Sequence, residues 1–425
     1  MDNTLNEIEK LVCLYYEDLA KKEAAKKVDR VSLSMPMFDS REAIRAIRTL
    51  LGGWISQGPN VAAFEKAFAQ YIGCKAGVGV NSGSSANLLA LLALKEVYHF
   101  QDGDEVIVPA ATFATVAMPV IQTGLVPVYV DVNRSTLNID PEQIPSAVSK
   151  KTRALMPVHT LGYPAQMPRL IELSSRCHLV VLEDCCEAHG SSIDLKKVGS
   201  FGEIATCSFF VAHNMTTGEG GMIVTDNEKL ETACRSLREF GRCDQKTVSK
   251  QRFYSDGVLT DYDRRYIFER LGYNFRMTDI TAAFGIEQLL KLDGMNEQRR
   301  ANADLLKELL KDSAGEFLEL PNEESGYRHT YYTFPIVLTE RFPFSRREFV
   351  EHLEANGIET RPLFAGCLPD QPGFRKSPGR IVGSLPNSRF LRDRLVFVGI
   401  HPGLGECHIE YMAEVINSFV LAREK

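Results

Sequence analysis

Short apolar runs alternate with helix-like segments from about residue 60 to residue 290. Each run is rich in Val, Ile or Phe, and the segments between the runs carry apolar residues at helical spacing. The runs are EVIVPA, VPVYVDV, RALMPV, LVVLED, IATCSFF and GMIVTD. Alternation of this kind predicts an α/β fold, with a mainly parallel sheet covered by helices.

The pattern changes at both ends of this region. Residues 1–30 contain LNEIEKLVCLYYEDLAKKEAAKK, a charged segment with helical spacing, followed by an extended stretch around VSLSMPMF. After residue 290, long helices with polar faces mix with a few strands such as YYTFPIVL. We therefore predict an N-terminal helical arm (1–30), a large domain (31–290) and a small C-terminal α+β domain (291–425). The polar, strand-poor stretch 243–266 is predicted to be a long functional loop.

Composition narrows the class of protein. With 425 residues, of which 44% are hydrophobic and 24% charged, the chain can bury a large core and form two domains. The sequence has no apolar stretch of about 20 residues and does not start like a secretory signal, so we expect a cytoplasmic protein without a membrane span. A net charge of -6 without long Lys or Arg runs argues against a nucleic-acid polymer as partner. The ten cysteines are expected to be reduced thiols, and the adjacent Cys185 and Cys186 cannot easily bridge.

Three segments carry candidate chemistry, and the first is NSGSSANLLALLAL at 81–94. A turn of small residues opens directly into an apolar helix there, so the first N–H groups of that helix lack partners and suit a phosphate. The hydroxyls of Ser84 and Ser85 add donors. A serine N-cap without any ligand explains the same residues equally well.

The other two segments follow predicted strands. In HLVVLEDCCEAHGSS, Asp184 lies at the carboxyl end of a strand, where open α/β sheets bind ligands, and its carboxylate can pair with a protonated pyridine nitrogen. A helix-capping role is the alternative. In CSFFVAHNMTTGEGGMIVTD, Gly218, Gly220 and Gly221 allow the backbone to approach a ligand closely.

The order of these segments resembles the DegT/DnrJ/EryC1/StrS sugar aminotransferase family, which has the aspartate-aminotransferase fold. A fourth segment, LGYNFRMTDITAAFGIEQLLKLD at 271–293, is similar to that family's signature, and the likeness runs from about residue 30 to the end. The resemblance implies a mainly parallel seven-stranded sheet in a large cofactor-binding domain, a smaller C-terminal α+β domain, and a homodimer with shared active sites. It also implies a pyridoxal 5'-phosphate cofactor.

One position departs from the family pattern. The family reads S-F-x-x-x-K before a G-E-G-G sequence, and the lysine holds the cofactor as a Schiff base; here Ser208 is followed five residues later by His213. No lysine lies between Lys197 and Lys229. An imidazole cannot form that stable bond, but its ordinary pKa of about 6.5 suits proton transfer. A decayed, inactive relative or a loop histidine is the alternative.

The same replacement is typical of a subgroup, the sugar-nucleotide 3-dehydratases that use pyridoxamine 5'-phosphate. Similarity to the subgroup extends through SGSSANLLAL, TLNID and GIETRPLFAG. One branch of the subgroup carries a [2Fe-2S] cluster on a C-x-C pair and further cysteines, and the arm at 1–30 resembles that branch. Here LREFGRCDQKTVSKQRF offers Cys243 alone, with Gln245 and Phe253 at the positions of further ligands, so we expect no iron-sulfur cluster and no metal. A cluster on Cys186, Cys207 and Cys243 is the alternative.

The resemblance implies a reaction and a role for each site residue. The substrate is a nucleotide-linked 4-keto-6-deoxy sugar, the C3 hydroxyl is removed, and glutamate is the amino donor that restores the cofactor. A sugar 4-aminotransferase and a non-catalytic binding protein are the rival interpretations. By the resemblance, His213 transfers the proton, Asp184 pairs with the ring nitrogen, and Glu187 lies near the phenolic oxygen of the cofactor. The cofactor phosphate is bound by Gly83, Ser84 and Ser208, and by Asn274 from a neighbouring subunit. Phe113 stacks on the cofactor ring, and Arg361 binds a phosphate of the substrate. His159 ends another strand near the site, where a structural hydrogen bond explains it at least as well.

Overall fold

The large sheet has the predicted α/β architecture. The computed structural model describes residues 2–24, 30–243, 245–311, 313 and 315–420. Its eight-stranded sheet has the order β1-β9-β8-β5-β4-β2-β3-β16. The strands are β1 (Ala76–Val80), β2 (Glu105–Pro109), β3 (Val126–Val130), β4 (Thr152–Leu155), β5 (Val180–Asp184), β8 (Ile204–Ser208), β9 (Gly221–Thr225) and β16 (Arg380–Ile381).

Seven of these strands form the mainly parallel sheet that the family resemblance implied. Strand β9 is antiparallel to both its neighbours, β1 and β8, and the two-residue β16 adds a parallel edge beside β3. The six apolar runs of the sequence correspond to β2, β3, β4, β5, β8 and β9. The sequence AGVGV of β1 was not among them, because its glycines remove half of the apolar side chains that mark a strand.

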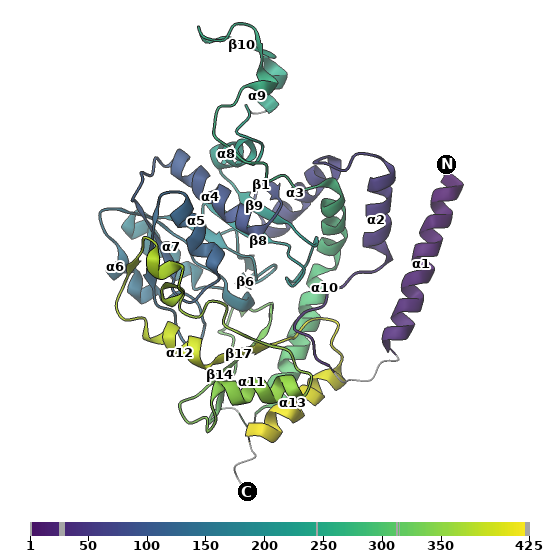
Figure 1. Cartoon of the computed structure of the whole chain (residues 1–425), viewed down its shortest axis with the longest axis vertical. Helices are drawn as coiled ribbons and strands as arrows, with labels where there is room; N and C mark the ends of the chain where they lie inside the picture. The colour runs from purple at the N-terminus through teal and green to yellow at the C-terminus, as the bar shows by residue number, and fades with distance from the viewer. Residues whose placement is uncertain (1, 25–29, 244, 312, 314, 421–425) are drawn as a thin grey trace.

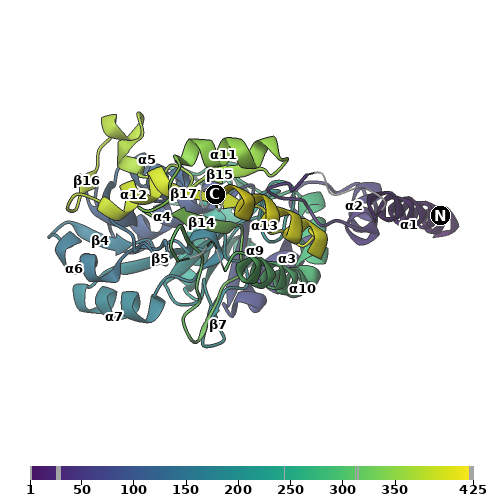
Figure 2. The same cartoon turned by 90° about the horizontal axis from the view of Figure 1, so that it is seen from below.

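Helices cover both faces of the sheet. Helices α4 (Gly83–Val97), α5 (Ala114–Gln122) and α8 (Glu228–Arg238) share one apolar core with the sheet. The opposite face packs against α3 (Pro59–Ile72) and α10 (Asp279–Leu309) at one end and against α6 (Ile144–Ala147) and α7 (Met167–Cys177) at the other. Figure 2 shows α5 and α7 on opposite sides of β4 and β5.

A second, smaller sheet lies at the other end of α10. It has the order β12-β14-β17-β15, from Leu318–Glu319, Phe334–Leu338, Leu395–Val398 and Thr360–Pro362, and packs with α11 (Arg346–Ala355), α12 (Pro386–Arg394) and α13 (Glu406–Val420). Helix α10 begins where the Thr278 hydroxyl accepts a hydrogen bond from the Thr281 N–H, and it continues for 31 residues. The predicted division at residue 290 therefore falls inside a continuous helix that belongs to both cores.

Two segments extend from the body of the molecule (Figure 1). Helix α1 (Asp2–Ala24) forms the predicted arm and is tied to α2 (Ser40–Leu51) by an ion pair of 2.6 Å between Glu9 and Arg48; residues 1 and 25–29 of the predicted arm lie outside the described residues. Within the predicted loop 243–266, α9 (Gln245–Lys250) precedes a pair of two-residue strands, β10 (Phe253–Tyr254) and β11 (Tyr262–Asp263), and residue 244 is not described.

A small three-stranded sheet joins β13 (Tyr327–Arg328), β6 (Ser192–Ile193) and β7 (Lys196–Lys197).

Two further expectations concern the whole chain. All ten cysteines are free thiols. Among the described residues, no helix has the length and apolar character that a membrane crossing requires.

Candidate active site

A cavity of about 310 Å³ opens at the carboxyl edge of the large sheet. It brings together seven of the predicted residues, which come from four separate parts of the chain: Gly83, Ser84, Phe113, Asp184, Glu187, Ser208 and His213. They meet because β1, β2, β5 and β8, which are parallel strands of one sheet, lead into the segments that carry them at this edge.

The start of α4 forms the end of the cavity suited to an anion. The Ser82 hydroxyl caps the helix by accepting a hydrogen bond of 3.1 Å from the Ser85 N–H, and Ser84 is exposed toward the cavity. Gly83 is packed so closely that a Cβ at this position would lie 2.5 Å from Cβ of Ser208. The first N–H groups of a helix have no partner within it and carry a partial positive charge, so this end suits a phosphate.

Asp184 is held rigidly on another wall of the cavity. One carboxylate oxygen accepts a hydrogen bond of 2.9 Å from the Asn87 side chain, and the other accepts one of 3.0 Å from the Cys186 N–H. Asn87 is in turn fixed by the Thr206 hydroxyl, 2.6 Å away. The carboxylate thus makes the local bond of a capping aspartate and also faces the cavity, where it can pair with a cationic ring nitrogen.

Glu187 presents a neutral acid to the same cavity. It is buried, and one of its oxygens accepts a hydrogen bond of 2.6 Å from the Leu161 N–H. Burial, reinforced by the nearby Asp184 carboxylate and opposed by the Leu161 N–H, raises the pKa of Glu187 to about 8. At neutral pH the side chain is therefore protonated and can donate a hydrogen bond.

His213 lies in the loop between β8 and β9, inside the cavity. Its backbone N–H closes a turn onto the Phe210 carbonyl at 3.0 Å, and its ring Nδ1 has no hydrogen-bond partner. The ring centroid is 5.2 Å from that of Tyr332 and 6.0 Å from that of His189. Desolvation, followed by the positive charge of Arg299, lowers the pKa of His213 to about 3. The imidazole is thus neutral near pH 7.

Aromatic side chains flank the mouth of the cavity. Phe113 is 50% exposed, although Thr112 before it is buried, and its ring packs edge-on against Phe364 with 5.7 Å between centroids. A half-exposed ring at a cavity wall offers a flat apolar surface on which a cofactor ring can stack.

Two predicted residues lie outside this cavity in the single chain. Asn274 is exposed, and its side-chain oxygen accepts a hydrogen bond of 3.0 Å from Arg276; its predicted place in the site of a neighbouring subunit stays a prediction. Arg361, on β15, is also exposed and donates to the Thr360 carbonyl at 2.6 Å. The structure does not bring Arg361 into the cavity, and its predicted phosphate contact stays a prediction as well.

His159 is a structural residue in this fold. It is fully buried, its Nδ1 accepts a hydrogen bond from the Ala165 N–H at 3.0 Å, and its Nε2 lies 3.1 Å from a Glu183 oxygen. Since Nδ1 accepts, Nε2 carries the proton and donates to Glu183. With Cys185 these two residues form a buried group spaced closely enough for a metal ion, but both imidazole nitrogens are already engaged by the protein.

Reasoning from the sequence missed several residues of the site. Tyr332, Phe364, Cys186 and Glu219 also line the cavity. Tyr332 and Phe364 come from the C-terminal third of the chain, in the segments YYTFPIVL and GIETRPLFAG, and neither was assigned to the site. Cys186 was considered only as a cluster ligand. Another such candidate, Cys243, lines a different hollow, beside Glu239 and Arg242.

Comparison with known proteins identifies the family. The model of the DegT/DnrJ/EryC1/StrS aminotransferase family matches residues 37–417. The chain belongs to this family. Lipopolysaccharide biosynthesis protein RfbH of Salmonella typhimurium is 38% identical, over 98% of each chain. The dTDP-4-dehydro-2,6-dideoxy-D-glucose 3-dehydratase of Saccharopolyspora spinosa is 37% identical, over 90% of this chain and 85% of its own.

Solved structures of DegT/DnrJ/EryC1/StrS proteins have the same fold. The Escherichia coli GDP-4-keto-6-deoxy-D-mannose-3-dehydratase, solved with bound hydrated PLP, superposes with a TM-score of 0.83 at 30% identity and covers 92% of this chain and 100% of its own. The expectation of an aspartate-aminotransferase-like fold is therefore confirmed.

Proposed function

We propose that the protein is a sugar-nucleotide 3-dehydratase that works with pyridoxamine 5'-phosphate. It removes the C3 hydroxyl of a nucleotide-linked 4-keto-6-deoxyhexose and yields a 3,6-dideoxy-4-keto sugar, with glutamate as the amino donor. The observation that carries the proposal is His213, a neutral imidazole at the family's lysine position in a cavity whose other cofactor-binding residues are retained. The names of the 3-dehydratases to which the chain is similar support it.

The cavity residues fit this cofactor. The helix start at Gly83 and Ser84 provides donors for the phosphate, and the Asp184 carboxylate provides an acceptor for the ring N–H. Phe113 provides the stacking surface, which holds ring orientation where no covalent bond does. Bound pyridoxamine phosphate supplies an amine that condenses with the C4 ketone and a ring that relays an electron pair toward C3, so that the hydroxyl leaves.

The residues of the chain hold the groups and move the protons. His213, uncharged near pH 7, accepts the proton from the cofactor carbon C4′. Asp184 keeps the ring nitrogen protonated, and the protonated Glu187 donates a hydrogen bond within the cavity. The lining side chains Phe113, Phe364 and Tyr332 limit access of water.

The proposal includes a homodimer. In a dimer with shared sites, Asn274, exposed here and outside its own cavity, completes the phosphate site of the neighbouring subunit. The proposal also places the reaction in deoxysugar biosynthesis without an iron-sulfur cluster, so the enamine product leaves the enzyme unreduced and hydrolyses with release of ammonia.

Product analysis tests the function. The purified enzyme is incubated with glutamate and each of several nucleotide-linked 4-keto-6-deoxyhexoses, and the products are identified by mass spectrometry and NMR. We expect loss of the C3 oxygen and one ammonia per turnover. A product with an amine at C4 and an intact C3 hydroxyl would instead establish a 4-aminotransferase. Iron and sulfide analysis of anaerobically purified protein tests the cluster alternative.

A further inference from the structure

A buried arginine without an acidic partner lies behind the candidate base. Arg299, on α10, is 3% exposed, and its Nη1 donates to the carbonyls of Tyr331 and Tyr332 at 3.1 and 3.0 Å. Its Nε has no hydrogen-bond partner. Within the described part of the chain, no carboxylate lies within ion-pair distance of this guanidinium. Burying an unpaired charge is costly, so the position calls for a reason.

The charge of Arg299 persists at neutral pH. Burial lowers the pKa of its guanidinium to about 10, which still leaves it protonated in the physiological range. A charge in a poorly solvated interior acts over longer distances than one at the surface, because water does not screen it.

Among the described residues, Arg299 is the one cation whose charge acts on His213. Tyr332 links the two, since its carbonyl accepts from Arg299 and its ring lies 5.2 Å from the His213 ring. His189 lies on another side, and burial keeps its pKa well below the ordinary value, so it is uncharged. Glu187 lines the same cavity and is neutral at pH 7.

Helix α10 also fixes the loop that carries His213. Asn296, one turn before Arg299, accepts a hydrogen bond of 3.0 Å from the side chain of Asn214, the residue after His213. The same Asn214 amide group donates to the Thr330 carbonyl at 3.0 Å. Asn296 and Arg299 therefore hold the His213 loop and the Tyr332 segment to one rigid helix.

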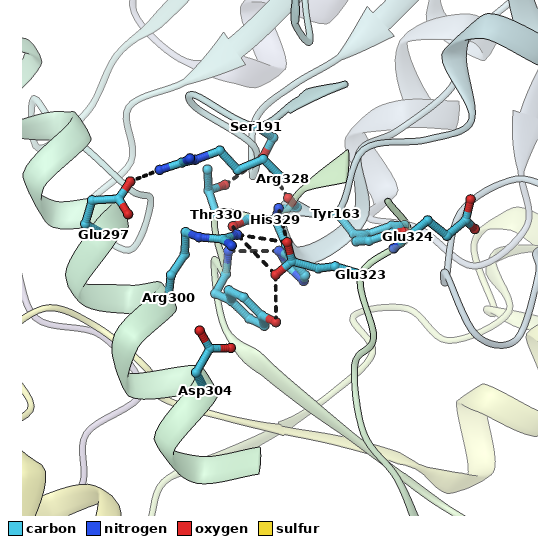
Figure 3. Close-up of polar contacts among 12 residues, drawn as sticks. Tyr163, Ser191, Glu297, Arg300, Asp304, Glu323, Glu324, Arg328, His329 and Thr330 are labelled. Atoms are coloured by element: carbon cyan, nitrogen blue, oxygen red, sulfur yellow. Dashed lines mark hydrogen bonds and ion pairs between the residues drawn. The ribbon is translucent and has the colours of Figure 1, made fainter. Parts of the chain in front are cut away.

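The segment before Tyr332 is anchored as well (Figure 3). The Thr330 hydroxyl is 2.7 Å from that of Ser191, and Arg300 donates to the His329 carbonyl at 2.8 Å. Arg300 forms an ion pair of 3.0 Å with Glu323 and is only partly buried. It is thus adjacent to Arg299 in sequence, but its charge is compensated.

We propose that Arg299 is a positioning residue whose fixed charge keeps the imidazole of His213 uncharged. Its charge is fixed behind Tyr332 by the two carbonyls and opposes a second positive charge on His213. The role as a base rests on the proposed function, whereas the electrostatic effect on His213 does not depend on which reaction follows.

The test separates the charge of Arg299 from its hydrogen bonds. Arg299→Gln keeps an N–H donor for the carbonyls and removes the charge, and Arg299→Lys keeps the charge. Full-length protein loaded with pyridoxamine phosphate and labelled at histidine is titrated by NMR, with the His213 signal assigned by its loss in His213→Asn. We expect Arg299→Gln to raise the pKa of His213 by about one unit, a tenfold change in proton affinity, and Arg299→Lys to leave it close to the wild type. The control Arg300→Gln should leave it unchanged.

Equal values of the His213 pKa in the Gln and Lys variants would overturn the proposal. Should Arg299→Gln fail to fold, the wild-type titration still tests the proposal, because a His213 that protonates near its ordinary pKa contradicts it. The acid limb of the pH profile of kcat/KM should move to higher pH in Arg299→Gln and return to the wild-type position in Arg299→Lys. An aminotransferase product with an Arg299-dependent His213 pKa would refute the proposed function and leave this inference standing.

Discussion

Glu187 allows the electrostatics of the site to be measured without any substrate. Its pKa of about 8, against an ordinary value of 4.5, means that the folded protein keeps a proton that the unfolded chain loses above pH 4.5. Between these two values the free energy of unfolding therefore falls as pH rises, and it falls by at most about 1.4 kcal/mol per pH unit. The variant Glu187→Gln removes this dependence, because its amide stays neutral at every pH and can still accept from the Leu161 N–H.

The expected magnitude follows from the two pKa values. Relative to wild type, Glu187→Gln should gain about 3.5 kcal/mol of unfolding free energy between pH 5 and pH 8. The residue is 7% exposed, so solvent screening reduces this figure little. Urea unfolding of the cofactor-free protein, followed by circular dichroism at both pH values, measures it.

Glu219→Gln is the matched control. Glu219 lines the same cavity but its side chain is exposed, so this variant makes the same Glu-to-Gln change at the cavity without altering a buried acid. If the difference between Glu187→Gln and wild type is the same at pH 5 and pH 8, then Glu187 is not held protonated, and the assignment of a neutral acid to the site is refuted.

Three further predictions concern the cofactor site. His213→Lys should abolish dehydration and permit a Schiff base with pyridoxal phosphate, which borohydride reduces and mass spectrometry detects. His213→Asn should abolish dehydration without forming a Schiff base. Unchanged dehydration in either variant contradicts the role of His213. Gly83→Val should weaken pyridoxamine phosphate binding at least about tenfold in calorimetry, since even its Cβ would lie 2.5 Å from Ser208; Gly294→Ala, where a Cβ meets nothing within 4 Å, should bind normally and gain up to about 1 kcal/mol of stability. Asp184→Asn should lower the pKa of the bound cofactor's ring nitrogen, seen by 15N NMR of labelled cofactor, and reduce kcat more than binding; an unshifted ring-nitrogen pKa argues against the pairing.

The sequence by itself determined the class of fold and the family, and it indicated most of the residues that meet in the candidate site. Six apolar runs marked six of the seven main strands, because a strand buried on both faces is rich in consecutive apolar residues. Asp184 and Ser208 were recognisable because they end β5 and β8, and His213 comes five residues after Ser208, at the edge of the sheet where strand ends meet. The replacement of lysine at position 213 is likewise a property of the sequence alone.

Only the tertiary structure decided the protonation states and the distant members of the site. Tyr332 lies more than a hundred residues after His213 in the chain, and Arg299 reaches both through α10, so no local pattern reveals that they meet. Whether Glu187 is charged depends on how completely the surrounding chain excludes water from its carboxyl group, which residue type and spacing do not specify. The sequence identifies an imidazole in place of an amine at position 213. Burial and the charge of Arg299, which only the tertiary structure reveals, keep that imidazole uncharged near pH 7.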